Sequence, residues 1–480
     1  MAVVVRSAVR TVRYASGRAR VLVLAAMLAA AGGALLIAAN GDSADDAAKA
    51  GVLPPCLLGP PPDAVASTPT PSPTGSGDKK RPVMFVGNNW EGTADVISTR
   101  GRKYRTLARI NIVPDYNDRA QEICLDPVDL GYFLGIRELV GEGNDQLVDD
   151  MYSTPDGKLL VVSRPSFKDV VGIHIAGPRT GELKWRFEVA GQRSDHMAVS
   201  PDGKQVAVSA STGNVVHLLN TKTGDEEGAF GSGDSPHENT YSADGKRIYH
   251  ASIGLVYTPG DDPALDTDTT KGDRFFQVVR ARDGEILARV DMGDKLAEAG
   301  YPNKSSAVRP MTITRNERRA FLQVSFYHGV VAYNLRKEKV LNTTDLPNLV
   351  PEVPREQYLL DSAHHGISLA GNDKRICVAG TMSDYAAVIN RRAAMRKDKL
   401  TPKLLELGEK PYWSTTSADG RKCYVSWSGT DDISVISFRT KKEIKHVEVG
   451  VPGGNRAHPQ RIRNGVVRQS FVKANRLGDS

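Results

Sequence analysis

The sequence predicts an all-β protein, a seven-bladed β-propeller that follows an export segment and a proline-rich linker. A turn motif, clearest as Ser200–Lys204, returns along the chain between short runs of alternating apolar and polar residues. Its acidic residue recurs after 46 positions, from Asp156 to Asp202 and again from Asp373 to Asp419. This period matches four-stranded propeller blades of about 40–50 residues, and the alternation excludes helical repeats.

Six copies of the motif divide most of the chain into equivalent units. Each unit has an apolar strand, an Asp-Gly turn or a substitute for it, and three further strands separated by polar turns. Because glycine accepts the positive φ of a tight hairpin, we expect a two-residue turn in which the aspartate caps the preceding backbone. The copies begin at Thr154, Ser200, Ser242, Thr314, Gly371 and Ser417.

A seventh unit is divided between the two ends of the repeat region. Residues 83–89, 94–98 and 106–110 match the second, third and fourth strands of a blade, with no first strand before them. His458–Ile462 matches the beginning of a blade that does not continue. We therefore expect residues 458–467 to pair beside the first of these strands and close the ring, which removes exposed sheet edges.

These repeats resemble the YVTN family of seven-bladed β-propellers, which occurs in archaeal surface-layer proteins and bacterial secreted proteins. Val206–Ala210 and Cys423–Trp427 stand in the place of the family's Tyr-Val-Thr-Asn strand, and Ile433–Ser437 follows the second of them. The resemblance covers residues 81–467 and implies the closed propeller fold. It implies no particular activity, since propellers of this kind perform many functions.

The first residues of the chain predict export. Residues 1–20 contain five arginines, and the 19 residues 21–39 are uncharged and apolar. Arginines on one side only keep the start of the chain in the cytoplasm and direct the rest across the membrane. The apolar run is either a cleaved signal peptide or a single-pass membrane anchor. Without the five arginines the net charge falls from +7 to +2, which excludes a broad electrostatic surface for nucleic acid.

The remaining chain divides into three parts. Residues 40–80 are rich in proline, serine and threonine, a composition typical of a semi-rigid spacer that holds a domain off a surface. Residues 81–467 form the predicted propeller, and residues 468–480 form a tail. We therefore expect an extracytoplasmic, monomeric protein that contacts the membrane only through its N-terminal segment.

Insertions into the repeat indicate where the propeller is modified. An acidic, mixed stretch occupies residues 115–150, residues 254–273 expand one blade, and residues 295–308 and 347–360 lengthen two connections. Asp261–Asp273 alternates carboxylates, but it lacks the glycine position and final glutamate of a calcium-binding loop, so we expect a solvated loop.

The four cysteines match no metal-binding spacing. Cys377 and Cys423 occupy equivalent places in consecutive repeats, which makes them a candidate disulfide in an oxidising compartment. The alternative is a pair of free thiols that behave as small buried apolar groups.

The segments that lead into the first strand of each blade carry unusual side chains. In a closed ring these segments meet at one end of the central channel, which we call the funnel. The candidate ligand-binding residues there are Arg193, Asp195, His196, His237, Arg309, His364, His365, Tyr412, Trp413 and His458. His364 and His365 are adjacent on an extended segment and point in different directions, so at most one faces the channel.

The sequence contains no serine-hydrolase, phosphate-loop, zinc-protease or haem-attachment motif, so no catalytic residue and no cofactor are predicted. We expect a binding module whose funnel takes a small molecule, a peptide or a surface protein. Imidazoles also suit a divalent metal, which leaves open a metal-assisted lyase or lactonase that uses the same residues. Two further alternatives are a structural surface-layer component and histidines that only cap the backbone of a neighbouring blade.

Overall fold

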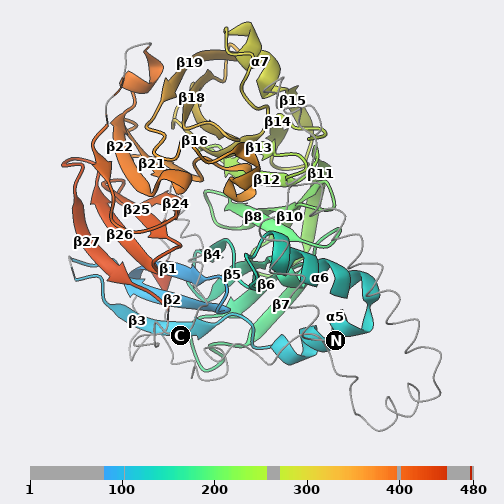
Figure 1. The fold of residues 1–480 in the computed structure, drawn as a ribbon. Coiled ribbons are helices and arrows are strands. Elements are labelled where there is room, and N and C mark those ends of the chain that lie inside the picture. The colour runs from blue at the N-terminus through green and yellow to red at the C-terminus, as the bar shows by residue number, and fades with distance from the viewer. Residues whose placement is uncertain are drawn as a thin grey trace.

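A computed structural model describes residues 81–101, 103–256, 271–396, 400, 402–450 and 476–477. Within these residues the chain forms seven four-stranded antiparallel sheets, the blades of a mainly β propeller (Figure 1). The three strands expected of the divided first unit are confirmed as β1, β2 and β3.

The strands of the first four blades are β1 (Arg81–Asn88), β2 (Thr93–Ser98) and β3 (Thr106–Asn111); β4 (Met151–Ser153), β5 (Leu159–Arg164), β6 (Asp169–His174) and β7 (Leu183–Glu188); β8 (Ser194–Val199), β9 (Gln205–Ala210), β10 (Val215–Asn220) and β11 (Glu226–Gly231); and β12 (Pro236–Tyr241), β13 (Arg247–Ser252), β14 (Phe276–Arg280) and β15 (Ile286–Val290). Those of the last three are β16 (Val308–Ile313), β17 (Ala320–Val324), β18 (Gly329–Asn334) and β19 (Lys339–Asp345); β20 (Gly366–Leu369), β21 (Arg375–Gly380), β22 (Tyr385–Asn390) and β23 (Leu404–Leu405); and β24 (Pro411–Thr416), β25 (Lys422–Trp427), β26 (Asp432–Ser437) and β27 (Glu443–Glu448).

The first strands of the blades surround the channel. Strands β8, β12, β16, β20 and β24 contact one another in succession, while later strands of each blade lie progressively further out. The apolar core lies between successive blades, as in the cluster that joins Phe321 and Val330 to Ile376 and Val378. Side chains at the same level of neighbouring first strands are thereby brought together.

The repeated turn is longer than the expected two-residue hairpin, because Val199 and Gln205 are separated by five residues. The Ser200 hydroxyl donates to Asp202 Oδ1 at 2.7 Å, and the same oxygen accepts the Lys204 N–H at 3.1 Å. The aspartate therefore caps the backbone that follows it and not the backbone before it. The same pair of bonds recurs in the turns that begin at Thr154, Ser242, Thr314 and Ser417.

Glycine is required in this turn for two reasons. Gly203 has a φ of +73°, and a Cβ on it would lie 2.6 Å from Cγ of Pro155 in the turn of the preceding blade. The turns of neighbouring blades are thus in contact, which excludes a side chain here.

The segment expected to supply the missing first strand of blade one, residues 458–467, lies outside the described residues, so closure by it stays a prediction. A two-residue strand, β28 (Arg476–Leu477), pairs antiparallel with the beginning of β1. The predicted export segment and linker, residues 1–80, also lie outside the description. No helix among the described residues is long and apolar enough to cross a membrane.

The propeller is mainly β and not all-β, because the described residues also include three α-helices. They are α5 (Tyr116–Leu125), α6 (Pro127–Leu139) and α7 (Met292–Glu298), and short 3₁₀ helices lie at η1 (Pro165–Phe167), η2 (Arg355–Gln357), η3 (Leu359–Asp361), η4 (Thr381–Ser383) and η5 (Ala393–Met395). Asp126 starts α6, because its carboxylate accepts the N–H groups of Val128 and Asp129 and Pro127 occupies the first helical position. The acidic 115–150 insertion is therefore a helical pair.

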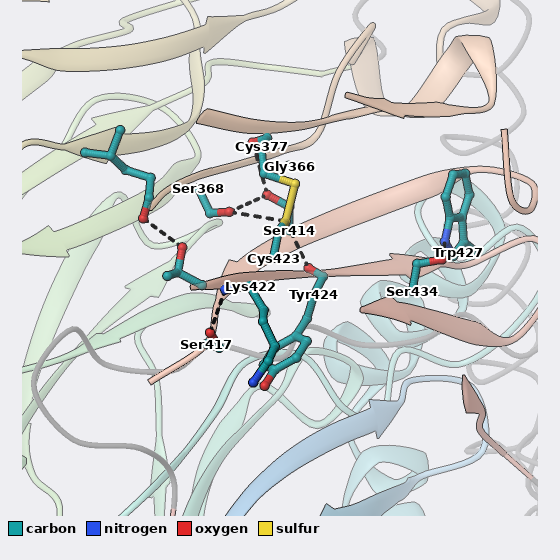
Figure 2. Close-up of a disulfide and its surroundings, with 12 residues drawn as sticks. Gly366, Ser368, Cys377, Ser414, Ser417, Lys422, Cys423, Tyr424, Trp427 and Ser434 are labelled. Atoms are coloured by element: carbon teal, nitrogen blue, oxygen red, sulfur yellow. Dashed lines mark hydrogen bonds between the residues drawn. A yellow bond between two sulfur atoms is a disulfide. The ribbon is translucent and has the colours of Figure 1, made fainter. Parts of the chain in front are cut away.

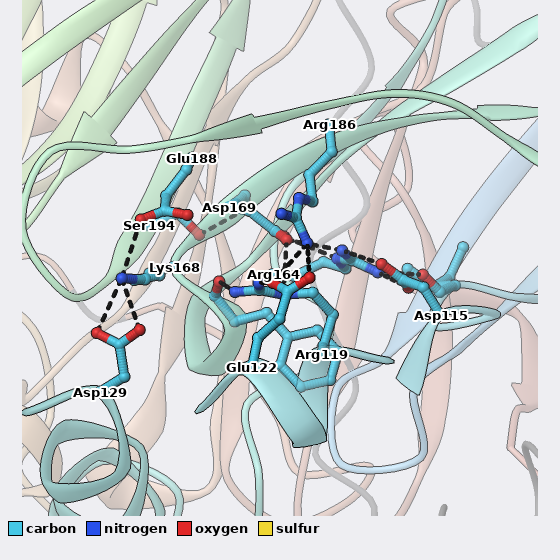
Figure 3. A network of polar contacts seen from close by, with 12 residues as sticks. Asp115, Arg119, Glu122, Asp129, Arg164, Lys168, Asp169, Arg186, Glu188 and Ser194 are labelled. Carbon is cyan, nitrogen blue, oxygen red and sulfur yellow. Dashed lines mark hydrogen bonds and ion pairs between the residues drawn. The ribbon is translucent and has the colours of Figure 1, made fainter. Parts of the chain in front are cut away.

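Buried ion pairs attach this helical pair to the second blade (Figure 3). The Arg164 guanidinium, fully buried at the end of β5, lies 2.5 Å from Asp115 and 2.7 Å from Asp169. Lys168 in turn contacts Asp129 of α6 at 2.8 Å. The insertion is thus held by charge pairs withdrawn from water, which depend strongly on each partner.

Replacing Arg164 by methionine tests this attachment. We expect Arg164→Met to lower the free energy of unfolding by about 3–5 kcal/mol, because it leaves buried Asp169 without its two-point partner. Arg186→Ala is the control, since Arg186 pairs with Glu122 in a part-exposed contact that is worth about 0–1 kcal/mol. Equal losses in the two variants, measured by urea unfolding, would contradict the assignment.

A disulfide joins the second strands of the sixth and seventh blades (Figure 2). Cys377 of β21 and Cys423 of β25 are fully buried, with Cα atoms 6.4 Å apart. The Ser368 hydroxyl lies 3.6 Å from the Cys423 sulfur, and Ser414 donates to Ser368 at 3.1 Å. The bond is a covalent link between two blades that are also joined by a backbone hydrogen bond, from the Gly371 N–H to the Gly420 carbonyl at 2.9 Å.

Removing the disulfide should destabilise the propeller. It closes a loop of 46 residues, so we expect Cys377→Ala/Cys423→Ala to lower the free energy of unfolding by about 2–4 kcal/mol. Cys423→Ala alone should account for most of this loss, because either substitution removes the link. A single variant as stable as the wild type would contradict the expectation.

Candidate functional site

The funnel contains a small cavity built from several blades. Its volume is about 60 Å³. The charged and aromatic residues that line it are Asp149, Arg193, Asp195, His196, His237, Arg309 and Tyr412. These residues come from the segments before β4 and β8 and from strands β8, β12, β16 and β24, so the structure brings residues of several blade entries together.

Four first strands are irregular at this level. In β8, β12, β16 and β24 the pairing with the second strand shifts by at least one position. The residues passed over by the shifts are Asp195, His196, His237, Arg309, Pro310 and Tyr412. Such bulges redirect side chains and are frequent beside functional sites.

Left-handed backbone conformations at non-glycine residues precede three of the funnel positions. Ser235 and Lys410 have φ values of 50° and 47° immediately before β12 and β24, and Leu360 and Asp361 have 48° and 60° before β20. Each such residue costs about 1–3 kcal/mol unless its surroundings hold it. Here the Leu360 carbonyl accepts a bond from Arg309, and Asp361 pairs with buried Lys271 at 3.0 Å.

Three histidines form the centre of the funnel. One ring nitrogen from each of His196, His237 and His365 lies within 4.8 Å of the others, and the Nε2 atoms of His237 and His365 are 3.3 Å apart. The His196 ring meets the His237 ring edge-on, at 4.3 Å between centroids. Tyr412 stacks on His365 at 4.1 Å.

Carboxylates surround His196. Asp149 and Asp150 place oxygens 3.4 and 3.8 Å from its Nδ1, and Asp195 Oδ1 is 3.9 Å from its Nε2. Burial opposes protonation, but the attraction of Asp149, Asp195 and Asp150 outweighs it and raises the pKa of His196 to about 9. Asp150 also accepts the Met197 N–H at 2.8 Å, which fixes the bulge of β8.

The pKa of His237 is shifted in the opposite direction from that of His196. Burial lowers its pKa well below the ordinary value of 6.5, and repulsion from His196, His365, Arg309 and Arg193 lowers it further. A protonated imidazole and a neutral one therefore lie side by side at neutral pH. The pair can give and accept a proton, or it can bind a ligand that displaces the proton.

The other predicted residues divide between the funnel and its surroundings. Arg193 donates to Asp195 at 2.6 Å, and Arg309 donates to Ser325 at 2.9 Å, so both guanidiniums are fixed in the wall. Trp413 is buried, with its ring 4.9 Å from that of His196. His458 lies outside the described residues.

The structure places the His364 side chain away from the funnel, beside Tyr385 and His328. Its Nε2 lies 3.0 Å from the Tyr385 hydroxyl, and its ring is 5.5 Å from that of His328. Burial, with repulsion from His328, lowers the pKa of His364 to about 3. The expectation that His364 and His365 point in different directions is confirmed.

A larger cavity of about 440 Å³ occupies the other end of the channel. Its rim includes turn-motif residues of five blades, namely Pro201, Ser242, Thr314, Gly371 and Ser417, and Trp413 also lines it. Glu238 faces this cavity whereas His237 faces the funnel, as expected for neighbours on a strand. The two therefore do not act as a dyad.

The repeat register points to two further residues of the site, because Asp149 and Asp150 lead into β4 as the histidines lead into β8 and β12. Sequence reasoning missed two others. Asn89 and Gln146, which bond to each other at 3.2 Å and line the funnel cavity, carry no such signal. They lie beside strands whose relative position only the fold determines.

The sheet topology defines the class of this protein as a seven-bladed β-propeller. No family model and no curated protein matches the chain, so no family is assigned. A similar solved structure is a chain of Kuenenia stuttgartiensis hydrazine synthase, with a TM-score of 0.52 and 15% identity, covering 77% of this chain and 96% of that chain. At this identity the likeness shows the fold alone.

The carboxylates around His196 generate a pH prediction. In metal-free protein we expect the ring of His196 to titrate near pH 9 by NMR, and Asp149→Asn to lower that pKa because it removes the nearest negative charge. The bound proton stabilises the folded state fully below pH 6.5, and this stabilisation is lost as the pH rises to about 9. Asp202→Asn, in a distant turn, should leave the pKa unchanged; the same pKa in the Asp149 variant and the wild type would contradict the assignment.

Proposed function

We propose that this protein is an extracytoplasmic binding module whose ligand site is the funnel. The observation that carries the proposal is the convergence of His196, His237 and His365 from three blades into one buried cluster. Strained backbone and register shifts at this level cost stability that a purely structural channel would not need.

The location outside the cytoplasm is supported by two features. The Cys377–Cys423 disulfide suits an oxidising compartment. The one-sided arginines and the apolar run of residues 21–39 support export, with the protein either secreted or held at the membrane by this segment. The resemblance of the repeats to the YVTN propellers supports the same assignment.

The size of the cavity restricts the ligand. Sites for organic ligands have volumes of about 300–1,000 Å³. The funnel cavity of about 60 Å³ is far smaller, so it takes an ion or the tip of a larger group. Arg193 and Arg309 supply positive charge, and Asp149 and Asp195 supply negative charge, which favours an ion or a strongly polar group over an apolar one.

A metal-assisted enzyme is the second candidate function. It is favoured by the geometry of His196, His237 and His365, whose ring nitrogens lie within 4.8 Å of one another. Three histidines leave a position of a bound metal ion open for water or a substrate.

A ligand screen tests the binding proposal. Full-length protein is exposed in turn to Zn²⁺, inorganic phosphate, sulfate and acetate, while the ring signals of His196 and His237 are followed by NMR. At least one ion should shift these signals and, at 100 times its Kd, stabilise the fold by about 2.7 kcal/mol. His237→Gln should abolish the response, and His364→Gln, in a buried histidine outside the funnel, should retain it. No response to any ion, or equal responses in both variants, would contradict the proposal.

A further inference from the structure

We propose that the funnel holds one first-row transition-metal ion on ring nitrogens of His196, His237 and His365. The inference rests on the proposed function, because it names the ligand of the same site. Imidazole nitrogens suit zinc, copper, nickel and iron, whereas calcium and magnesium prefer oxygen. The donor set therefore indicates the first group of metals.

The spacing of the histidines fits metal coordination better than hydrogen bonding. Zn–N bonds of about 2.0–2.1 Å in a tetrahedral site place two ligand nitrogens about 3.3–3.4 Å apart. The Nε2 atoms of His237 and His365 are 3.3 Å apart, whereas N–H hydrogen bonds are typically about 2.9–3.0 Å long. The His196 nitrogen lies within 4.8 Å of both, so a small inward movement of one ring completes the triad.

An outer layer of carboxylates is already in place. Metal-binding histidines commonly give their second ring N–H to a carboxylate, which orients the ring and increases its basicity. Asp149 Oδ2 lies 3.4 Å from Nδ1 of His196, which leaves Nε2 for a metal. Asp150 accepts the Met197 N–H and so holds the backbone next to His196. The nearby carboxylates also offset the positive charge of a bound ion.

A vacant coordination position would face the funnel cavity. The three histidines leave one position of a tetrahedral ion for water or a small ligand. The cavity of about 60 Å³ beside His196 and His237 has room for such a group. Arg193 and Arg309 line the same space, so an anion bound to the metal would meet positive charge.

Zinc binding tests the inference directly. Full-length protein is stripped with EDTA, dialysed and titrated with Zn²⁺, with bound metal counted by elemental analysis and affinity measured by calorimetry. We expect one zinc per chain and no competition from Ca²⁺ or Mg²⁺. His365→Gln should weaken binding at least 100-fold, and Asp149→Asn should weaken it about 10- to 100-fold, as outer-layer partners commonly do.

The matched control is His364→Gln, the same substitution one residue earlier in the chain, which should retain wild-type affinity. Unfolding curves of all variants separate lost binding from lost folding. The Asp149→Asn variant, which keeps all three histidines, provides a second comparison if His365→Gln unfolds. Absence of stoichiometric zinc, or equal affinity in the two glutamine variants, would overturn the inference. If zinc does not bind but inorganic phosphate still shifts the His196 and His237 signals, the metal inference is wrong and the binding proposal stands. If no ion of the screen shifts these signals, both are wrong.

Discussion

The hydrogen bonds of the repeated turn set the level at which five of the first strands meet the channel. In each of five turns a hydroxyl and a following backbone N–H both bond to one side-chain oxygen, at the place held by Asp202 in the clearest copy. The turn contacts between neighbouring blades, as between Gly203 and Pro155, fix the blades relative to one another at this end. His196, His237 and His365 lie six to eight positions before the acidic or equivalent residue of their turns. They therefore lie at the end of the channel opposite the turns, where they meet.

The funnel uses backbone that the repeat itself does not require. A regular first strand would alternate its side chains between the two adjoining blades. Register shifts at His196, His237 and Tyr412 interrupt this alternation and turn the side chains towards the axis. The Asp361–Lys271 pair and the Arg309 bond to Leu360 then hold the strained approach to His365. The site thus depends on contacts between blades, not on any single blade.

The repeat pattern was sufficient to predict the propeller and to indicate several of the residues that meet at the funnel, because spacing along a strand determines position around an axis. The repeat pattern did not predict features for which the local sequence gives competing signals or none. The helical insertion carries its signal at Asp126-Pro127, but acidic composition concealed it. Register shifts have no sequence signature here, and the packing of His364 against Tyr385 and His328 also needed the fold.

Trp413 has a consequence for how the channel is used. Its indole contacts the histidine rings on one side and lines the wide cavity on the other. The channel is thus divided into an ion-sized chamber and a vestibule large enough for a small organic molecule. Trp413 thus packs between two compartments of different size, against the histidines of the smaller one and in the lining of the larger one. A shift of the histidine rings on one side of Trp413 would therefore change the shape of the larger compartment on its other side.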